Sequence, residues 1–163
     1  MAENIDFELT KPVAANEPRD GQTPEIRDLE KIMKSEESAV EAFRQVLKKF
    51  PDYAQINDLK SIFSDHEKAV EFWKTQLRSK AAPIEESTGP WKEVVETFSG
   101  THKLSGNSST LKSLRDGEEH GLKEYEELNE SNNLSFQSMA FIKNICLDQQ
   151  RKHLAVIDGL MEK

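Results

Sequence analysis

The amino-acid sequence predicts an all-α protein, a four-helix bundle with a long connection between its second and third helices. Apolar residues recur at spacings of three and four in four long segments, which is the period of an amphipathic helix. Charged residues make up 32% of the 163-residue chain and aromatic residues only 7%, a balance typical of helices. The second and third segments are separated by about 25 residues, too many for a simple loop in a compact domain.

The first helix follows a polar segment over residues 1–22 that has no sustained period, so we expect a flexible N-terminal arm there and one domain over residues 23–163. Thr23 can cap the helix and Pro24 suits its first position. The apolar stripe that follows contains one carboxylate, Glu36, and Pro51 marks the turn after the helix.

The second helix has a heptad seam in which six of the seven positions are apolar and the remaining one is His66. The seam consists of Ile56, Leu59, Phe63, His66, Val70, Trp73 and Leu77. Such a pattern predicts helices that pack at shallow crossing angles in a bundle.

The connection after the second helix contains Trp91, Val94, Val95 and Phe98, which indicate a short amphipathic helix. A long crossover between the second and third helices is the topology of ferritin-like antiparallel bundles. The sequence therefore predicts that topology, with the short helix in the crossover.

The third helix begins near Ser109, ends near Glu130, and again carries a carboxylate in its apolar stripe. Glu118 lies four residues after Leu114 and four before Leu122, so it faces the same side as both leucines. A carboxylate there has to be paired, protonated, metal-bound or placed at the edge of the core.

The fourth helix follows the polar turn at residues 131–133. Its predicted apolar face consists of Met139, Ile142, Ile145, Cys146, Val156, Ile157 and Leu160. Gln149 and His153 lie between these residues on the same face, one turn apart.

The polar residues of the four stripes are expected to meet at one level of the bundle. Glu36 and His66 are about equally far from the turn between their helices, and Glu118 and Gln149 from theirs. At 1.5 Å per residue, all lie roughly 20–25 Å from their turns.

Carboxylate-bridged di-metal bundles combine a Glu from each of two helices with a Glu-x-x-His motif from each of the others. Here the positions three residues before His66 and His153 hold Phe63 and Gln150, so both paired carboxylates are missing. A full di-metal site is therefore disfavoured, and two interpretations stay open.

The first interpretation is a polar core network in which Glu and His side chains satisfy one another without metal. The second is a single iron, manganese or zinc ion, with a ligand set drawn from the four helices. The candidate ligands are Glu36, His66, Glu118 and His153, with Gln149, Gln150 and Glu119 as candidate neighbours.

Other polar residues are weaker candidates. Glu37 and Glu119 would replace Glu36 and Glu118 only if the helices rotated, and His120 is expected to be exposed. Cys146 is expected near the polar residues as buried packing rather than as a redox thiol.

Composition excludes several classes of function. The formal net charge of −8 argues against binding to nucleic acid or to an anionic membrane surface. No apolar run approaches the roughly 20 residues of a membrane span, and no secretory signal is visible. The single cysteine fits a reducing compartment, so we expect a cytoplasmic protein. Any homodimer or protein partner would bind through helical faces.

A resemblance to a known family adds to this interpretation. The segment 117–119, together with 122–123 and 125–128, resembles the third helix of a bacterial family in the ferritin-like superfamily, known only as a domain of unknown function. The segments 41–44 and 59–63, Trp91 and His153 are similar too, so that the resemblance covers about residues 24–161.

The resemblance implies a four-helix bundle with a crossover and no settled activity. Relatives with complete ligand sets bind iron or manganese and handle oxygen or peroxide, but Phe63 and Gln150 depart from that set. We therefore expect a non-catalytic bundle, either stress-associated or an interaction protein. The alternative is a metal-binding oxidoreductase or metal-handling protein with a reduced ligand set.

Overall fold

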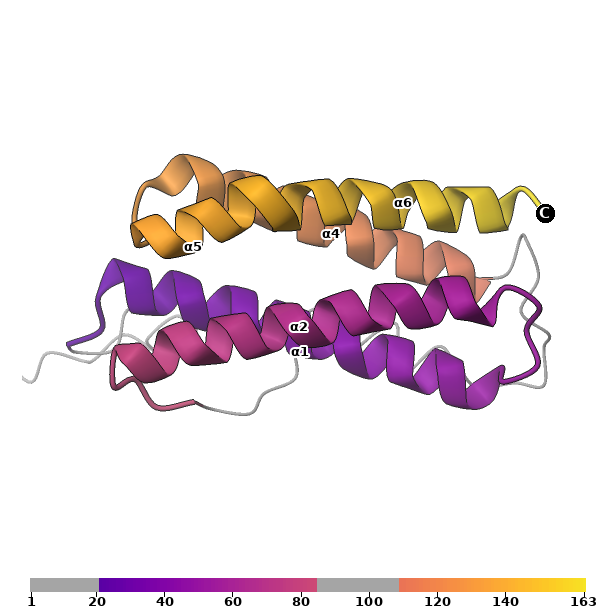
Figure 1. The fold of residues 1–163 in the computed structure, drawn as a ribbon, viewed down its shortest axis with the longest axis horizontal. Helices are drawn as coiled ribbons and strands as arrows, with labels where there is room; N and C mark the ends of the chain where they lie inside the picture. Colours follow the sequence, from indigo (N-terminus) through magenta and orange to yellow (C-terminus); the bar gives the residue numbers. More distant parts are fainter. Residues whose placement is uncertain (1–20, 85–108) are drawn as a thin grey trace, which may run out of the picture.

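The computed structural model describes residues 21–84 and 109–163, and within these ranges the regular structure is entirely helical, as predicted. The N-terminal arm up to residue 20 and the predicted crossover helix lie outside the described residues. The helices are α1 (Pro24–Lys49), α2 (Ile56–Ser79), α4 (Ser109–Ser131), α5 (Phe136–Phe141), the π-helical turn η1 (Ile142–Cys146) and α6 (Leu147–Met161). The last three form one long rod, so the described chain contains four long helical rods (Figure 1).

The helix ends follow the local sequence signals. The hydroxyl of Thr23 accepts a hydrogen bond from the backbone N–H of Ile26 at 3.2 Å, and Pro24 is the first residue of α1, as predicted. Between α4 and α5, Asn132 has a φ of 55°, a left-handed conformation that Asn tolerates better than most residues. Ser135 then caps α5 by accepting a hydrogen bond from the backbone N–H of Ser138.

The rods form two hairpins that pack against each other. α1 packs along α2, and α4 packs along α6, while α1 also contacts α4 and α2 contacts α6. The end of α2 and the start of α4 lie at opposite ends of the bundle (Figure 1). This placement of helix ends is the one that a long crossover requires.

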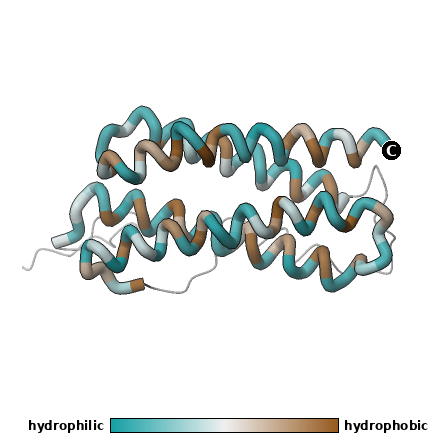
Figure 2. Tube along the Cα trace, viewed as in Figure 1, coloured by the Kyte–Doolittle hydropathy of each residue, from teal (hydrophilic) through white to brown (hydrophobic). Residues whose placement is uncertain are grey.

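The apolar core is divided into two clusters along the bundle. One cluster includes Leu29, Trp73 and Tyr125, and the other includes Phe43 and Leu59. Apolar positions recur along every rod with polar positions between them (Figure 2). On each rod, a buried polar residue lies between the segments that belong to the two clusters: Glu36 on α1, His66 on α2, Glu118 on α4, and Gln150 and His153 on α6. A polar layer therefore crosses the bundle between the two apolar clusters.

The buried face of the fourth rod differs from the predicted one. Ile145 and Val156, predicted to lie on the apolar face, are 41% and 37% exposed. A π-helical turn holds one residue more than an α-helical turn, so η1 rotates the buried face relative to a regular helix. Cys146 and Gln150 are buried on the rotated face.

The seam of α2 is also shifted slightly. Phe63 is only half-buried, while the neighbouring Ile62 and Ala69 are buried in the core clusters. None of the helices in the described ranges is long and apolar enough to span a membrane.

Candidate functional site

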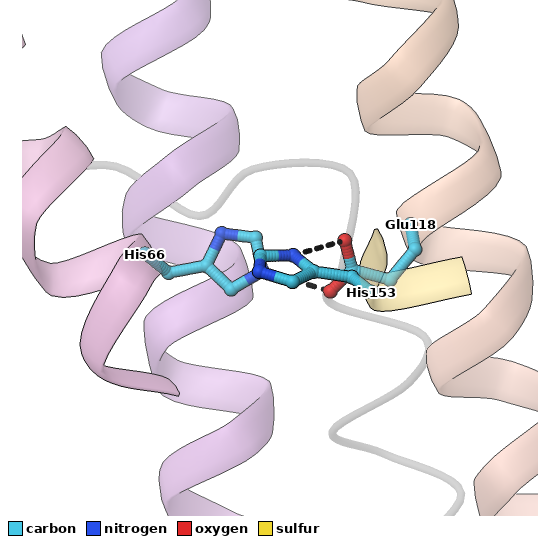
Figure 3. A group of neighbouring side chains, drawn as sticks. All are labelled: His66, Glu118 and His153. Atoms are coloured by element: carbon cyan, nitrogen blue, oxygen red, sulfur yellow. Dashed lines mark hydrogen bonds and ion pairs between the residues drawn. The ribbon is translucent and has the colours of Figure 1, made fainter. Parts of the chain in front are cut away.

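The structure brings the four predicted polar residues into direct contact. His66 Nδ1 lies 2.6 Å from Glu36 Oε2, and His66 Nε2 lies 2.8 Å from Glu118 Oε1. The other oxygen of Glu118 lies 3.2 Å from His153 Nδ1. Glu118 thus faces both histidines and offers one oxygen to each (Figure 3).

Three further residues extend this cluster into a chain of hydrogen bonds that we call the polar network. At one end, the Tyr125 hydroxyl donates to Glu36 Oε1 at 2.5 Å, and Trp73 Nε1 donates to the Tyr125 hydroxyl at 3.1 Å. At the other end, His153 Nε2 lies 3.1 Å from Asp65 Oδ2. The polar network therefore consists of Trp73, Tyr125, Glu36, His66, Glu118, His153 and Asp65.

Almost all of the polar network is shielded from water. Glu118 is 0% exposed, and Glu36, His66 and His153 are buried as well, whereas the side chain of Asp65 is 25% exposed. Burying an unpaired carboxylate costs several kcal/mol, so each buried carboxylate needs a partner. The hydrogen bonds supply these partners from a different helix in each case.

The His66 ring carries a positive charge. Both of its nitrogens face carboxylate oxygens, which only accept hydrogen bonds when ionised, so both nitrogens act as donors. Burial alone lowers the pKa of His66, but the charges of Glu118 and Glu36 outweigh it and hold the pKa well above its usual value. His66 is therefore an imidazolium held between two carboxylates.

Glu118 is the matching anion. Burial raises the pKa of this carboxyl, but His66 and His153 outweigh that effect and lower the pKa from 4.5 to about 2. Glu118 thus stays ionised in the interior at any pH near neutrality.

Tyr125 and Cys146 stay neutral beside these charges. Burial, followed by the charge of Glu36, raises the pKa of the Tyr125 phenol well above its usual value, and the same two causes raise the pKa of the Cys146 thiol. A thiol that does not ionise is a poor nucleophile, which agrees with the packing role expected for Cys146.

Gln150 occupies the position three residues before His153, where the di-metal template has a carboxylate. Its Nε2 donates to the backbone carbonyl of Glu118 at 3.2 Å. The close approach depends on Gly121, because a Cβ atom at that position would lie 2.5 Å from Gln150 Nε2. Gly121 therefore makes the space in α4 that Gln150 fills.

The other candidate neighbours lie further out. Gln149 is half-buried at the edge of a small cavity beside the histidines. The side chain of Glu119 is 64% exposed and pairs with Arg115 at 3.2 Å on the surface of α4. Glu37, the alternative to Glu36, pairs with Lys74 at 3.0 Å, away from the polar network.

Three residues have metal-binding side-chain atoms close to one another. One ligand atom each from His66, Glu118 and His153 can be chosen so that all three lie within 4.8 Å of one another, and residues 21–84 and 109–163 contain no other such group of three. Glu36 lies outside this group because it faces the far nitrogen of His66. The sequence missed Asp65, which holds the far nitrogen of His153 in the same way.

The sequence gives only weak indications that Asp65 and Tyr125 belong to the polar network. Asp65 lies next to His66 but outside the heptad seam, where an acidic residue normally faces solvent. Tyr125 lies three residues after Leu122, at a spacing that favours the apolar face of α4, but a buried Tyr hydroxyl usually needs a hydrogen-bond partner, which here is Glu36.

Comparison with protein-family models, with curated proteins and with solved structures finds no match. The fold and the site define the protein as a helical bundle with a buried Glu/His cluster.

Proposed function

We propose that the protein binds one divalent transition-metal ion between His66, Glu118 and His153. The observation that carries this proposal is the orientation of the two rings. Each histidine turns one nitrogen to Glu118 and holds a further carboxylate, Glu36 or Asp65, on its other nitrogen. Histidines that bind metals almost always donate their second N–H to a carboxylate, a carbonyl or water, which fixes the ring for coordination.

The charges of the cluster suit a divalent cation. Glu36, Glu118 and Asp65 supply carboxylates around the two rings, and His66 as an imidazolium provides positive charge in the metal-free protein. A metal needs the ring nitrogen without its proton, so binding would release protons and bring in the positive charge that they supplied. Mixed imidazole and carboxylate donors suit iron, manganese and zinc.

The ligand set supports one ion rather than two. A second ion would need the bridging carboxylates of the di-metal template. Phe63 and Gln150 stand at those positions, and the amide of Gln150 is already engaged with the backbone of α4.

Metal analysis tests the proposal. We expect protein purified without chelator, or metal-free protein titrated with Mn²⁺, Fe²⁺ or Zn²⁺, to bind one ion per chain. His153→Gln should weaken binding by more than about 10-fold, because even the loss of an outer-shell partner of a ligand costs about 10- to 100-fold in metal affinity. His120→Gln is the matched control, because His120 is half-exposed on α4 and its ring faces Glu124 at 3.4 Å. A folded wild-type protein that binds none of these metals would overturn the proposal.

A second function is favoured by one observation, the completeness of the polar network. The unpartnered buried side-chain atoms of the described chain belong to Glu124 and Asn129, and none belongs to the polar network. Such a network can hold the register of the helices without any ion. On this proposal the protein is a non-catalytic interaction or stress-associated bundle, and its folded state is unchanged by added metal.

We also propose that the four helices have the ferritin-like topology, with a crossover between α2 and α4. The sequence pattern and the positions of the ends of α2 and α4 support a ferritin-like topology with a crossover. We propose likewise that the protein is related to the bacterial family that it resembles and that it is cytoplasmic. A second copy or a partner protein would bind through its helical faces.

A further inference from the structure

We propose that a metal ion reaches the buried site through the seam between α2 and α6, with Asp65 as the first carboxylate that it meets. We call this path the α2–α6 route. The inference rests on the proposed function, because it concerns how the same site is filled.

Burial points to this side of the bundle. Among the carboxylates and imidazoles of the polar network, Asp65 has the most exposed side chain, at 25%, whereas the side chain of Glu36 is 6% exposed and that of His153 is 5% exposed. Its other face lies against His153 Nε2, and His153 in turn faces Glu118. Asp65 therefore connects the surface to the proposed ligands in two steps.

A small cavity lies beside Asp65 and the two histidines. It has room for about one water-sized molecule, with a volume of about 10 Å³. Its lining includes the partly exposed Asp65 and Gln149 and the buried His66 and His153. Ala69 also lines it, and this small side chain leaves the space open where a larger one would fill it.

The packing of the helices favours the same seam. α2 meets α6 over a short stretch, whereas α1 with α2 and α4 with α6 pack along their lengths. The π-helical turn η1 lies beside the seam and supplies Cys146 to the cavity wall. Single π-helical turns inside α-helices are frequently found at functional sites.

The charges at the opening allow a cation to approach. The Lys68 ammonium is 3.9 Å from Asp65 Oδ1, but its side chain is largely exposed and free to swing into solvent. Lys152 on α6 is held by Asp148 at 2.8 Å. Asp65 thus offers a carboxylate that an incoming cation can bind before it loses its remaining water.

Stopped-flow uptake of Co²⁺, followed by its visible absorption, tests the route on the full-length protein. Ala69→Leu should fill the cavity and slow both uptake and release at least about 10-fold, while the equilibrium Kd changes less than about 3-fold. Ala69→Val is a milder second variant, because overpacking a core costs about 1–3 kcal/mol and the larger side chain can prevent folding. Ala155→Leu on the exposed side of α6 is the matched control.

Asp65 is tested separately. Asp65→Asn should slow Co²⁺ uptake, whereas Glu67→Gln removes the same charge from the other side of α2 and should leave the rate unchanged. The outcomes separate the two proposals. If the wild-type protein binds no Co²⁺, Mn²⁺, Fe²⁺ or Zn²⁺ at equilibrium, the proposed function fails. If it binds Co²⁺ but Ala69→Val takes it up as fast as the control, only the α2–α6 route is wrong.

Discussion

His66 Nε2 lies 2.8 Å from Glu118 Oε1, which joins α2 to α4 across 52 positions of the chain. Both side chains are buried, and the pair lies between the two apolar clusters of the core. Removing one partner from a buried ion pair leaves the other charge uncompensated in the interior. The stability of the bundle should therefore depend on both members of the pair.

We predict that Glu118→Ala lowers the free energy of unfolding by about 3–5 kcal/mol, the usual effect of breaking a buried pair. Urea unfolding of metal-free protein, followed by circular dichroism, measures the change. Glu119→Ala is the matched control, because its side chain is largely exposed and its contact with Arg115 is on the surface. We expect that control to lose no more than about 0.5 kcal/mol, and equal losses in the two variants would contradict the buried pair.

The pair also predicts how stability depends on pH. The raised pKa of His66 makes its contribution complete below its ordinary value of 6.5 and lost as the pH rises through the folded-state pKa. The pKa of Glu118, lowered from 4.5 to about 2, makes its contribution complete above 4.5 and lost as the pH falls toward 2. These two groups therefore stabilise the metal-free protein most between about pH 4.5 and 6.5.

Urea unfolding in the presence of chelator across this pH range measures the profile. Stability should fall on the acid side below about pH 4.5 and on the alkaline side above about pH 6.5. A metal-free protein that becomes steadily more stable from pH 6.5 to 9 would show that His66 is not held as an imidazolium.

We predict that replacing Gly by Ala has opposite effects on stability at two helical positions, Gly159 and Gly121. Ala is favoured over Gly inside a helix by about 1 kcal/mol, so Gly159→Ala, whose Cβ would meet nothing within 4 Å, should stabilise the protein. Gly121→Ala should displace Gln150 and break its hydrogen bond to the Glu118 carbonyl. Leaving a buried polar group unpaired costs about 1–3 kcal/mol, which cancels or exceeds the helix gain. Thermal unfolding of both variants should rank Gly159→Ala above the wild type and Gly121→Ala at or below it, and an equal increase in both would refute the role of Gly121.

The sequence was sufficient to predict the four long helices and the level at which four polar residues lie along them. Helical periodicity fixes which residues share a face, and counting from the turns gives their heights, so Glu36, His66, Glu118 and His153 could be placed at one level. Their contacts at 2.6 to 3.2 Å agree with that placement.

Periodicity could not predict features that depend on the neighbouring helix. Asp65 lies on the side of α2 that faces α6, and only the packing of the two helices shows that it meets His153. The π-helical turn η1 contains no Pro or Gly to indicate it, yet it rotates the face of the fourth rod and exposes Ile145. The partner of Gln150 depends equally on the space that Gly121 leaves in α4.

Restoring a carboxylate beside His153 provides the sharpest test of the site. Gln150→Glu would create a Glu-x-x-His motif on α6, with two side chains that project from the same face and can grip one ion. In the metal-free protein, this substitution replaces an amide donor to the Glu118 carbonyl with a fourth carboxylate beside those of Glu36, Glu118 and Asp65, so we expect a loss of about 1–3 kcal/mol. With Mn²⁺ or Zn²⁺ present, the added ligand should tighten binding, and the stabilisation by metal should grow with the ratio of free metal to Kd.

Unfolding of Gln150→Glu with chelator and with added metal separates the two effects. Gln137→Glu, an exposed position on α5, adds the same charge far from the site and should change neither quantity. If the site binds metal, Gln150→Glu should be less stable than the wild type in chelator and should gain more stability than the wild type from added metal. If Gln150→Glu destabilises the protein and added metal does not restore its stability, the polar network holds the helices together without an ion. That result would favour the non-catalytic bundle over the metal-binding protein.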